Sequence, residues 1–295
     1  MSKIYKGIDI SSYQKSIYWS KAAKNIDFVM IRSGYGNNIS QIDNMFKSHI
    51  NGAIKAGIKH IGIYHFSYAR NIEEAKKEAN VCLEIIKPYK KYINLPVAFD
   101  WEYDSYDYCV RNGIKPTKSL CNNMAKEFLE VVKNQGYTPM LYTNPDYGNR
   151  FFNLKDYENL WIAQYANKCD IENVDIWQYT GSGKIDGIAG DVDLNYCYNQ
   201  KYFESEDTYM SFKKSDNNDG VFAVKEQLIA LYEMGAISQK VDENGVFGEG
   251  TEKAIKQVQK LSELSETGIA DTKTVRAIGQ LLRKRINNAG KLLKR

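Results

Sequence analysis

Eight short segments rich in β-branched and aromatic residues recur along the first two thirds of the chain, and helical patterns separate the early ones. These segments lie at 6–10, 27–33, 61–67, 95–102, 139–144, 160–165, 175–180 and 192–196. Amphipathic helical patterns occupy 40–56, 71–87 and 117–135, and the last two begin after the capping residues Asn71 and Thr117. Strands that alternate with helices favour a parallel sheet.

The spacing of the segments limits the architecture further. The last two intervals between strand centres are about 15 and 17 residues, and a crossover that contains a helix needs about a dozen connecting residues or more. A regular eightfold α/β barrel usually needs about 250 residues, whereas these segments occupy about 200. We therefore predict an irregular TIM-like barrel with roughly five helical crossovers, followed by strands that are poor in helices.

A change of composition marks the end of the barrel. The segment 204–219 is polar and shows neither strand nor helix periodicity, which is typical of a linker. Beyond it, VKEQLIALYEMG and GTEKAIKQVQKL are helical in pattern, and a third helix is expected after Asp271. The predicted organisation is a barrel over 1–203, a linker over 204–219 and a small all-α module of three helices over 220–295.

Charge and hydropathy exclude several classes of protein. Forty basic and 36 acidic residues give a net charge of +4, too balanced to predict nucleic-acid binding. No apolar run of about 18 residues predicts membrane insertion, and the start shows no signal peptide, so we expect synthesis in the cytoplasm. The basic tail is either solvated or suited to an anionic polymer surface. It contains Arg276, Arg283, Lys284, Arg285, Lys291, Lys294 and Arg295.

Four acidic residues lie at or near predicted strand ends: Asp9, Asp100, Glu102 and Asp193. Successive strand residues alternate between faces, so Asp100 and Glu102 share one face and Trp101 takes the other. Burial and like charge keep one carboxyl protonated, as glycoside hydrolysis requires. Alternatively, loop amides satisfy these acids, or the cluster binds magnesium or calcium. The cysteines and the three histidines show no zinc spacing, so we predict no metal or cofactor.

Five blocks in fixed order carry a resemblance to a known family. They read GIDIS, GIYHFSYA, VAFDWE, LWIAQY and WQYTGSGKIDGIAGDVDLN. In these blocks the chain resembles the glycoside hydrolase family 25 lysozymes, the N-acetylmuramidases common in phage endolysins and bacterial autolysins. The resemblance implies a (β/α)5β3 barrel that hydrolyses the β-1,4 bond between N-acetylmuramic acid and N-acetylglucosamine in bacterial peptidoglycan, with retention of configuration.

The resemblance also implies roles for single residues. Glu102 matches the general acid, Asp100 its acidic partner, and Asp9 and Asp193 the acids of the first and last strands. The nucleophile is either Asp100 or the 2-acetamido oxygen of the substrate. Aromatic rings at the cleft would bury the apolar faces of sugars, and core packing is the alternative for each ring. The candidate substrate contacts are Tyr64, Tyr142, Trp161, Trp177 and, as a polar contact, Gln178.

The C-terminal segment resembles a three-helix peptidoglycan-binding domain whose repeated motif reads roughly DGxFGxxT. The first copy, NGVFGEGT, keeps most positions, whereas Thr267 and Ala270 depart from the motif in the second. The leading hypothesis is therefore a wall-degrading enzyme of the phage endolysin type with a wall-targeting module, made in the host cytoplasm and acting after release. The rival hypotheses are a non-catalytic wall-binding protein and a metal-dependent phosphodiesterase.

Overall fold

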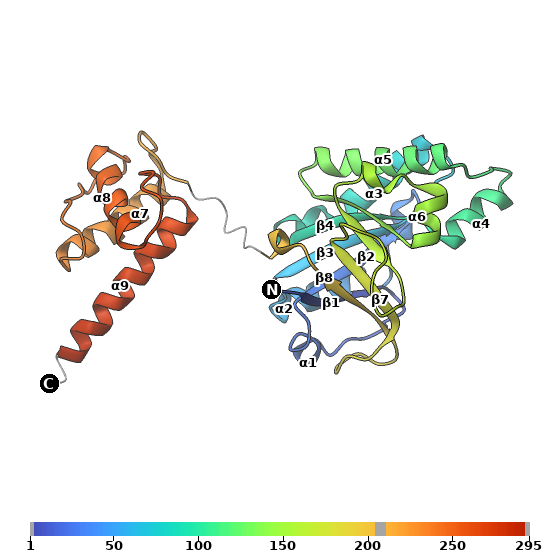
Figure 1. Cartoon of the computed structure of the whole chain (residues 1–295), viewed down its shortest axis with the longest axis horizontal. Coiled ribbons are helices and arrows are strands. Elements are labelled where there is room, and N and C mark those ends of the chain that lie inside the picture. The colour runs from blue at the N-terminus through green and yellow to red at the C-terminus, as the bar shows by residue number, and fades with distance from the viewer. Residues whose placement is uncertain (1–2, 204–210, 293–295) are drawn as a thin grey trace. The chain divides into compact units, whose positions relative to one another are not determined.

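The structure is a computed structural model that describes residues 3–203 and 211–292, with side chains as far as residue 286. The chain divides into two compact units, Met1–Glu204 and Ser205–Arg295 (Figure 1). Each unit has its own hydrophobic core, so each is described by itself.

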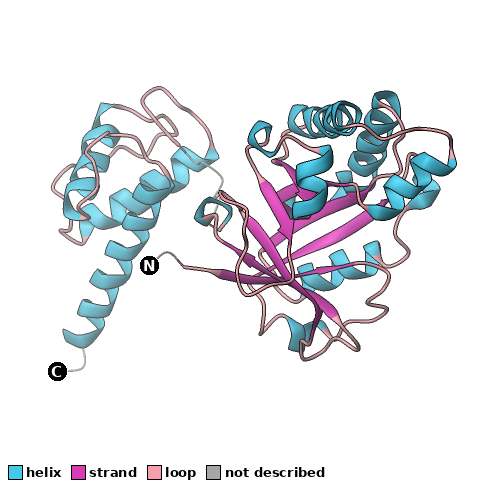
Figure 2. Cartoon of the chain, turned by 45° about the vertical axis from the view of Figure 1, so that its right-hand side comes forward, coloured by secondary structure: helices cyan, strands magenta, loops and turns pink. Residues whose placement is uncertain are grey.

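The first unit is a closed barrel of eight strands, as the sequence predicts (Figure 2). Each of the first six strands is parallel to the next, and β8 runs antiparallel to both β7 and β1. The strands are β1 (Tyr5–Ile10), β2 (Phe28–Tyr35), β3 (His60–Phe66), β4 (Ile93–Asp100), β5 (Pro139–Thr143), β6 (Leu160–Ala163), β7 (Ile176–Gly183) and β8 (Val192–Cys197).

The prediction of five helical crossovers is confirmed, because each connection from β1 to β6 contains an α-helix. The segments 164–175 and 184–191, both fully described, contain none. The barrel helices are α1 (Trp19–Ala22), α2 (Phe46–Lys55), α3 (Ile72–Ile86), α4 (Tyr103–Arg111), α5 (Lys118–Asn134) and α6 (Pro145–Phe151), with 3₁₀ turns η1 (Ile39–Gln41), η2 (Lys87–Tyr92), η3 (Leu154–Asp156) and η4 (Gln200–Tyr202).

The direction of β8 departs from the parallel sheet that alternating strands and helices favour. Only residues 184–191 connect β7 to β8. A parallel return needs a crossover of about a dozen residues or more, whereas an antiparallel return needs only a short turn. The short connection therefore reverses the last strand, and β8 closes the barrel against β1.

Two hydrophobic clusters fix the barrel. The outer cluster lies between the strands and helices, where Asn71 and Thr117 cap α3 and α5 as predicted. The inner cluster fills the barrel and includes Phe28, Met30, Leu95 and Met140. Because side chains fill the interior, the barrel leaves room for a ligand only at its end.

The second unit contains three helices, as predicted: α7 (Asp219–Glu233), α8 (Glu249–Leu261) and α9 (Thr272–Leu292). Residues 211–218, which the sequence analysis assigns to the linker, pack on this unit. Phe212 is buried in its core and pairs with Ala270, and Asn217 pairs with Val246. No helix in the described part of the chain is long and apolar enough to cross a membrane.

One fully buried polar side chain holds each motif loop of the second unit. The ammonium of Lys225 on α7 donates to Asp242, to Asn244 Oδ1 at 2.8 Å and to the carbonyl of Val246 at 2.8 Å. In the second copy, the amide of Gln259 on α8 makes comparable bonds to the side chain of Thr267 and the carbonyl of Ile269, each at 2.9 Å. In both copies a buried side chain therefore bonds to a carbonyl of the loop.

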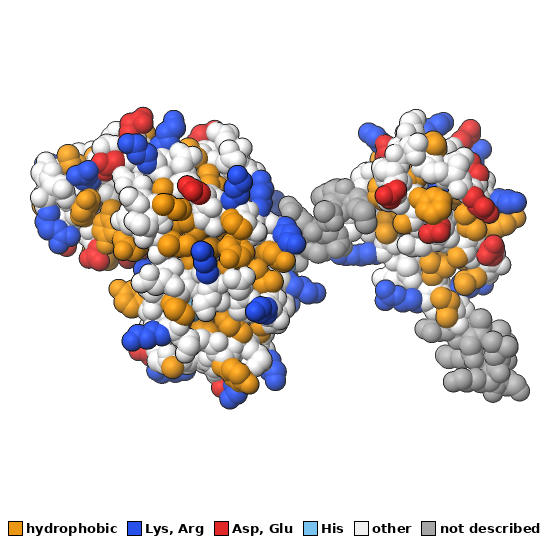
Figure 3. All heavy atoms as spheres, turned by 180° about the vertical axis from the view of Figure 1, so that it is seen from behind, with side chains coloured by type: hydrophobic (Ala, Val, Ile, Leu, Met, Phe, Trp, Pro, Cys, Tyr) orange, Lys and Arg blue, Asp and Glu red, His pale blue; other side chains and the backbone are white. Residues whose placement is uncertain are grey.

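Basic side chains are spread over the chain. On the face shown in Figure 3, the Lys and Arg side chains of the barrel unit lie scattered among uncharged and hydrophobic ones. In the predicted basic tail, Arg283, Lys284 and Arg285 are exposed on α9. The side chain of Lys291, and Lys294 and Arg295 entirely, lie outside the described residues.

Candidate active site

The strand register brings the predicted site residues to one end of the barrel. Asp9 is the register partner of Asp193, and Gln178 is the partner of Asn195. A row of partners crosses β3 to β6, formed by Phe66, Asp100, Tyr142 and Trp161. Because register partners share one face of a sheet, these side chains meet inside the barrel mouth.

A cavity of about 210 Å³ opens there, and all four predicted acids line it. It lies at the carboxyl ends of the parallel strands, where barrel enzymes hold their active sites. The lining residues are Asp9, Ser11, Tyr13, Gln14, Arg32, Tyr64, Phe66, Asp100, Glu102, Tyr142, Trp161, Tyr165, Gln178 and Asp193.

Asp100 and Glu102 reach the cavity from the junction of β4 and α4. Asp100 ends the strand, and the backbone N–H of Glu102 donates to Ser105 Oγ at 3.0 Å, which fixes the start of the helix. Trp101 lies between them, is fully buried and packs on Phe151 at 5.4 Å between ring centroids. The alternation predicted from the sequence therefore places the two carboxyls together and the indole in the outer core.

The cavity raises the pKa of both carboxyls. Burial is the largest cause for each; the charge of Glu102 raises the pKa of Asp100 further, and Arg32 opposes it. A hydrogen bond with Tyr142 lowers the pKa of Glu102 against the effect of burial. Oδ1 of Asp100 is buried and has no hydrogen-bond partner in the described structure. Such a pair holds one proton near neutral pH and so offers an acid and a carboxylate together.

Asp9 and Asp193 form a second pair on β1 and β8. Burial raises the pKa of Asp9 well above its usual range, and the charge of Asp193 raises it further. Burial also raises the pKa of Asp193. Oδ2 of Asp9 accepts hydrogen bonds from Gln178 Nε2 at 2.9 Å and from Asn195 Nδ2 at 2.7 Å.

Arg32 is the basic residue of the cavity lining, and the protein itself neutralises its charge. Its Nε donates to Asp43 Oδ2 at 2.8 Å, and a second guanidinium nitrogen donates to Ser12 Oγ at 3.0 Å. The side chain of Asp43 is fully buried. With this pair neutral, the carboxyls leave the cavity negative, which suits a reaction that develops positive charge.

Four of the five predicted substrate contacts line the cavity: Tyr64, Tyr142, Trp161 and Gln178. Trp177 is the exception and must be reassigned. It precedes Gln178 on β7, so its side chain points to the opposite face of the sheet. There it donates its Nε1–H to the carbonyl of Gln164 at 2.8 Å and packs on Tyr196.

Two of these four predicted contacts, Trp161 and Gln178, expose almost no surface to a ligand. Trp161 is 1% exposed and packs edge-on against Tyr142 and Tyr64, with ring centroids 4.6 and 5.8 Å away. Gln178 is 3% exposed, and its side-chain amide bonds to Asp9, Tyr142 and Tyr165. Trp161 and Gln178 therefore hold the exposed cavity residues in place and offer a ligand little contact of their own.

The sequence analysis missed several cavity residues. Tyr13 is 83% exposed and Tyr165 is 64% exposed, so both offer ring surface at the rim. Tyr13 lies in a loop beyond a strand end, where no periodicity reports orientation. Tyr165 lies in the predicted strand segment 160–165, on the same face as Trp161, so alternation gave a signal for it. Arg32 had a usable signal, because it lies near the end of a predicted strand. Asn195 does not line the cavity but bonds to Asp9, and it had a signal because it lies two residues after Asp193.

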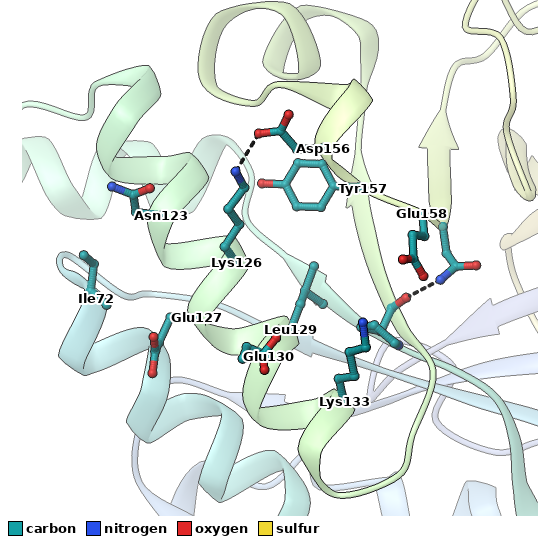
Figure 4. A pocket seen from close by; sticks show the side chains of 12 residues that line it. Ile72, Asn123, Lys126, Glu127, Leu129, Glu130, Lys133, Asp156, Tyr157 and Glu158 are labelled. Carbon is teal, nitrogen blue, oxygen red and sulfur yellow. Dashed lines mark hydrogen bonds and ion pairs between the residues drawn. The ribbon is translucent and has the colours of Figure 1, made fainter.

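A larger hollow of about 540 Å³ lies elsewhere, along the outside of α5 (Figure 4). It is bordered by Ile72 and by residues 156–159. Lys126 pairs with Asp156 at 2.6 Å, and Glu127 pairs with Lys76 at 3.1 Å. Unlike the four carboxyls of the barrel mouth, these two acids are ion-paired with lysines on the surface.

The histidines have structural partners. His65 is buried between Ser33 Oγ and the carbonyl of Gly36, at 2.9 Å from each, and burial lowers its pKa to about 4. His49 contacts the carbonyl of Ser11 at 3.0 Å. Within residues 3–203 and 211–292, no group of three or more His, Cys, Asp or Glu is arranged to hold a metal ion.

Paired carboxyls in an aromatic-lined cavity at the mouth of an α/β barrel are the arrangement that glycoside hydrolysis needs. Comparison with known families agrees: residues 8–188 match the model of glycosyl hydrolases family 25. The chain belongs to this family and is a glycoside hydrolase of the lysozyme class. This membership favours the enzyme over the non-catalytic binder and the phosphodiesterase.

The chain is similar to several named proteins, and it spans about half the length of one of them, LytC. The chain is 27% identical to the autolytic lysozyme of Clostridium acetobutylicum over 94% of this chain and 79% of that protein. The catalytic domain of endolysin ply40 from bacteriophage P40 of Listeria monocytogenes is 25% identical with a TM-score of 0.58, covering 68% of this chain and 97% of that one. The autolysin LytC of Streptococcus pneumoniae is 27% identical with a TM-score of 0.56, covering 66% of this chain and 47% of that one.

The second unit also matches a known family. Residues 217–278 match the model of a peptidoglycan binding domain, which agrees with the motif resemblance. The match begins within the segment 211–218 and ends in α9. The chain therefore combines a catalytic barrel with a peptidoglycan-binding unit.

Proposed function

We propose that this lysozyme hydrolyses the β-1,4 bond between N-acetylmuramic acid and N-acetylglucosamine, with Glu102 as general acid and retention of configuration. The observation that carries the proposal is the pair Asp100 and Glu102, held on one side of a cavity with aromatic walls. Glu102 is the more exposed of the two, since it begins α4 at the rim. It is thus the carboxyl better placed to protonate a leaving sugar oxygen.

The unpartnered oxygen of Asp100 suggests how the proton reaches Glu102. A donor on the substrate, such as the N–H of a 2-acetamido group, would bond to Oδ1 and favour the ionised form of Asp100. The proton shared by the pair would then stay on Glu102. The same contact would hold the acetamido oxygen near the anomeric carbon, so we favour the acetamido group as nucleophile over direct attack by Asp100.

The second unit would concentrate the barrel at its substrate. Tethering two binding units raises the effective concentration of one wherever the other is bound. We propose that the unit holds the chain on peptidoglycan, and that the basic residues of α9 add attraction to anionic wall polymers. Synthesis in a host cytoplasm followed by release, as for a phage endolysin, is part of this proposal.

Mass spectrometry of digested peptidoglycan tests the proposed bond. A muramidase releases fragments with muramic acid at the new reducing end, and this is the expected result. New reducing-end glucosamine would show a different glycosidase and overturn the proposal. Loss of hydrolysis in excess chelator would instead support the metal-dependent alternative.

A further inference from the structure

Two buried amides converge on one oxygen of Asp9. Gln178 Nε2 and Asn195 Nδ2 lie 2.9 and 2.7 Å from Asp9 Oδ2. Gln178 is 3% exposed, and Asn195 is 1% exposed. Because the two residues are register partners on β7 and β8, their side chains lie side by side on the inner face. This oxygen therefore receives two N–H donors out of reach of bulk water.

The orientation of the Asn195 amide is fixed by a donor on its far side. The indole Nε1–H of Trp161, which can only donate, lies 2.8 Å from Asn195 Oδ1. The hydroxyls of Tyr142 and Tyr165 lie 3.1 and 3.2 Å from Gln178 Oε1. Turning the amide of Asn195 by half a turn would set donor against donor. Its NH₂ group must therefore face Asp9.

We infer that Gln178 and Asn195 are positioning residues that keep Oδ2 of Asp9 an unprotonated acceptor, so that the pair Asp9 and Asp193 carries its shared proton on the other oxygens. Asp193 raises the pKa of Asp9 by its charge and by a side-chain hydrogen bond, and a hydrogen bond between two carboxyls requires one proton. The side-chain amides of Gln178 and Asn195, which we call the amide clamp, thus determine which oxygens of Asp9 and Asp193 carry the proton. Its relevance to turnover rests on the proposed function, whereas the clamp itself does not.

The groups around Asp9 determine in which direction its pKa moves when an amide donor is removed. Burial and Asp193 raise the pKa of Asp9, and the hydrogen bonds from Asn195 and Gln178 lower it. Arg32 is paired with Asp43 and so is already neutralised. The other ionisable groups that interact with Asp9 across the cavity are Asp100, Tyr64, Tyr142 and Tyr165. Removing one amide donor should therefore raise the pKa of Asp9 further.

Gln178→Met and Gln178→Glu in the full chain separate a positioning role from a structural one. The Met variant loses the donor at every pH, so the acidic limb of kcat/KM should move upward by about one pH unit or more. While its carboxyl is protonated, the Glu variant keeps the contact to Asp9 and the contacts to the tyrosine hydroxyls. It should match the parent near pH 5 and lose at least about tenfold in kcat/KM as that carboxyl ionises. Gln164→Met, at a site outside the cavity lining, is the matched control.

A ¹³C titration of the Asp9 carboxyl gives a readout that does not depend on activity. Its midpoint should rise in Gln178→Met and stay in place in Gln164→Met. An unchanged midpoint, or equal loss of activity at all pH values in both Gln178 variants, would overturn the inference. If Gln178→Met does not fold, Gln178→Glu carries the same test. A shifted midpoint in a chain that hydrolyses no peptidoglycan would refute the proposed function and leave the clamp standing.

Discussion

The backbone N–H of Ser67 donates to the carbonyl of Asp100 at 2.7 Å and so joins the ends of β3 and β4 beside the catalytic pair. The buried carboxyl of Glu78 on α3 holds Ser67 in place, because one of its oxygens lies 2.5 Å from Ser67 Oγ and the other accepts the backbone N–H of Tyr68 at 2.8 Å. A helix in the outer layer thereby supports the backbone of a catalytic residue.

This support should depend on pH. Burial raises the pKa of Glu78 from 4.5 to about 8, so the folded state keeps a proton that the unfolded state releases above pH 4.5. The free energy of unfolding therefore falls as pH rises from about 4.5 to about 8, with an upper bound of about 5 kcal/mol for this group. Glu78→Gln keeps the acceptor for Tyr68 and should be more stable than the parent at pH 8.

Urea unfolding at pH 5 and pH 8 measures the effect. Tryptophan fluorescence reports on the barrel, since Trp19, Trp101, Trp161 and Trp177 all lie in it. The difference between Glu78→Gln and the parent should grow with pH. A difference that stays constant from pH 5 to pH 8 would show that Glu78 is not protonated in the folded barrel.

Replacing Trp161 on β6 and replacing Trp177 on β7 should have different effects on kcat. Trp161→Phe removes the donor that orients Asn195, and we expect kcat to fall about tenfold, the cost of roughly one such hydrogen bond. Trp177→Phe removes a bond to the carbonyl of Gln164 outside the cavity and should leave kcat within about twofold. Steady-state kinetics on purified cell walls compares the variants. Equal losses would argue that Trp177 does contact the substrate.

The stability and the wall binding of the second unit should depend on Lys225. Lys225→Met leaves the oxygens of Asp242, Asn244 and Val246 without their common donor, and we expect a loss on the order of 3 kcal/mol in the stability of this unit. Wall binding should fall, while hydrolysis of soluble glycan fragments stays near the parental rate. Lys253→Met is the control, because Lys253 is exposed and makes one surface pair with Glu249.

Thermal unfolding and wall sedimentation check this prediction. Lys253→Met should cost about 0.5 kcal/mol or less and should sediment with walls like the parent. Normal wall binding by a destabilised Lys225→Met chain would show that the first motif loop takes no part in recognition.

Much of the fold follows from local sequence patterns. The strands show continuous apolar segments, and α3 and α5 show both amphipathic periodicity and capping residues. The helix α4 was not predicted, because its polar segment Tyr103–Arg111 directly follows a strand and has little apolar character. The packing of Phe212 on the second unit was missed for a similar reason, since a single buried aromatic residue in a polar segment gives no periodic signal.

The candidate site was only partly predictable. The four acids are visible because alternation and strand ends place them, and Asn195 follows from the same rule once Asp193 is placed. Trp177 was assigned to the site together with its neighbour Gln178, although adjacent strand residues face opposite ways. The clamp on Asp9 joins residues 169 and 186 positions away from it, so only the closed barrel reveals it.

The central claim is that Glu102 delivers a proton to the bridging oxygen of the wall glycan. Turnover of purified peptidoglycan by Glu102→Gln, measured as new reducing ends beside the parent, tests it most directly. General acid catalysis contributes about 10²- to 10⁴-fold, so we predict a fall of at least about a hundredfold with normal folding and normal wall binding. Near-parental release of reducing ends by this variant would contradict the account.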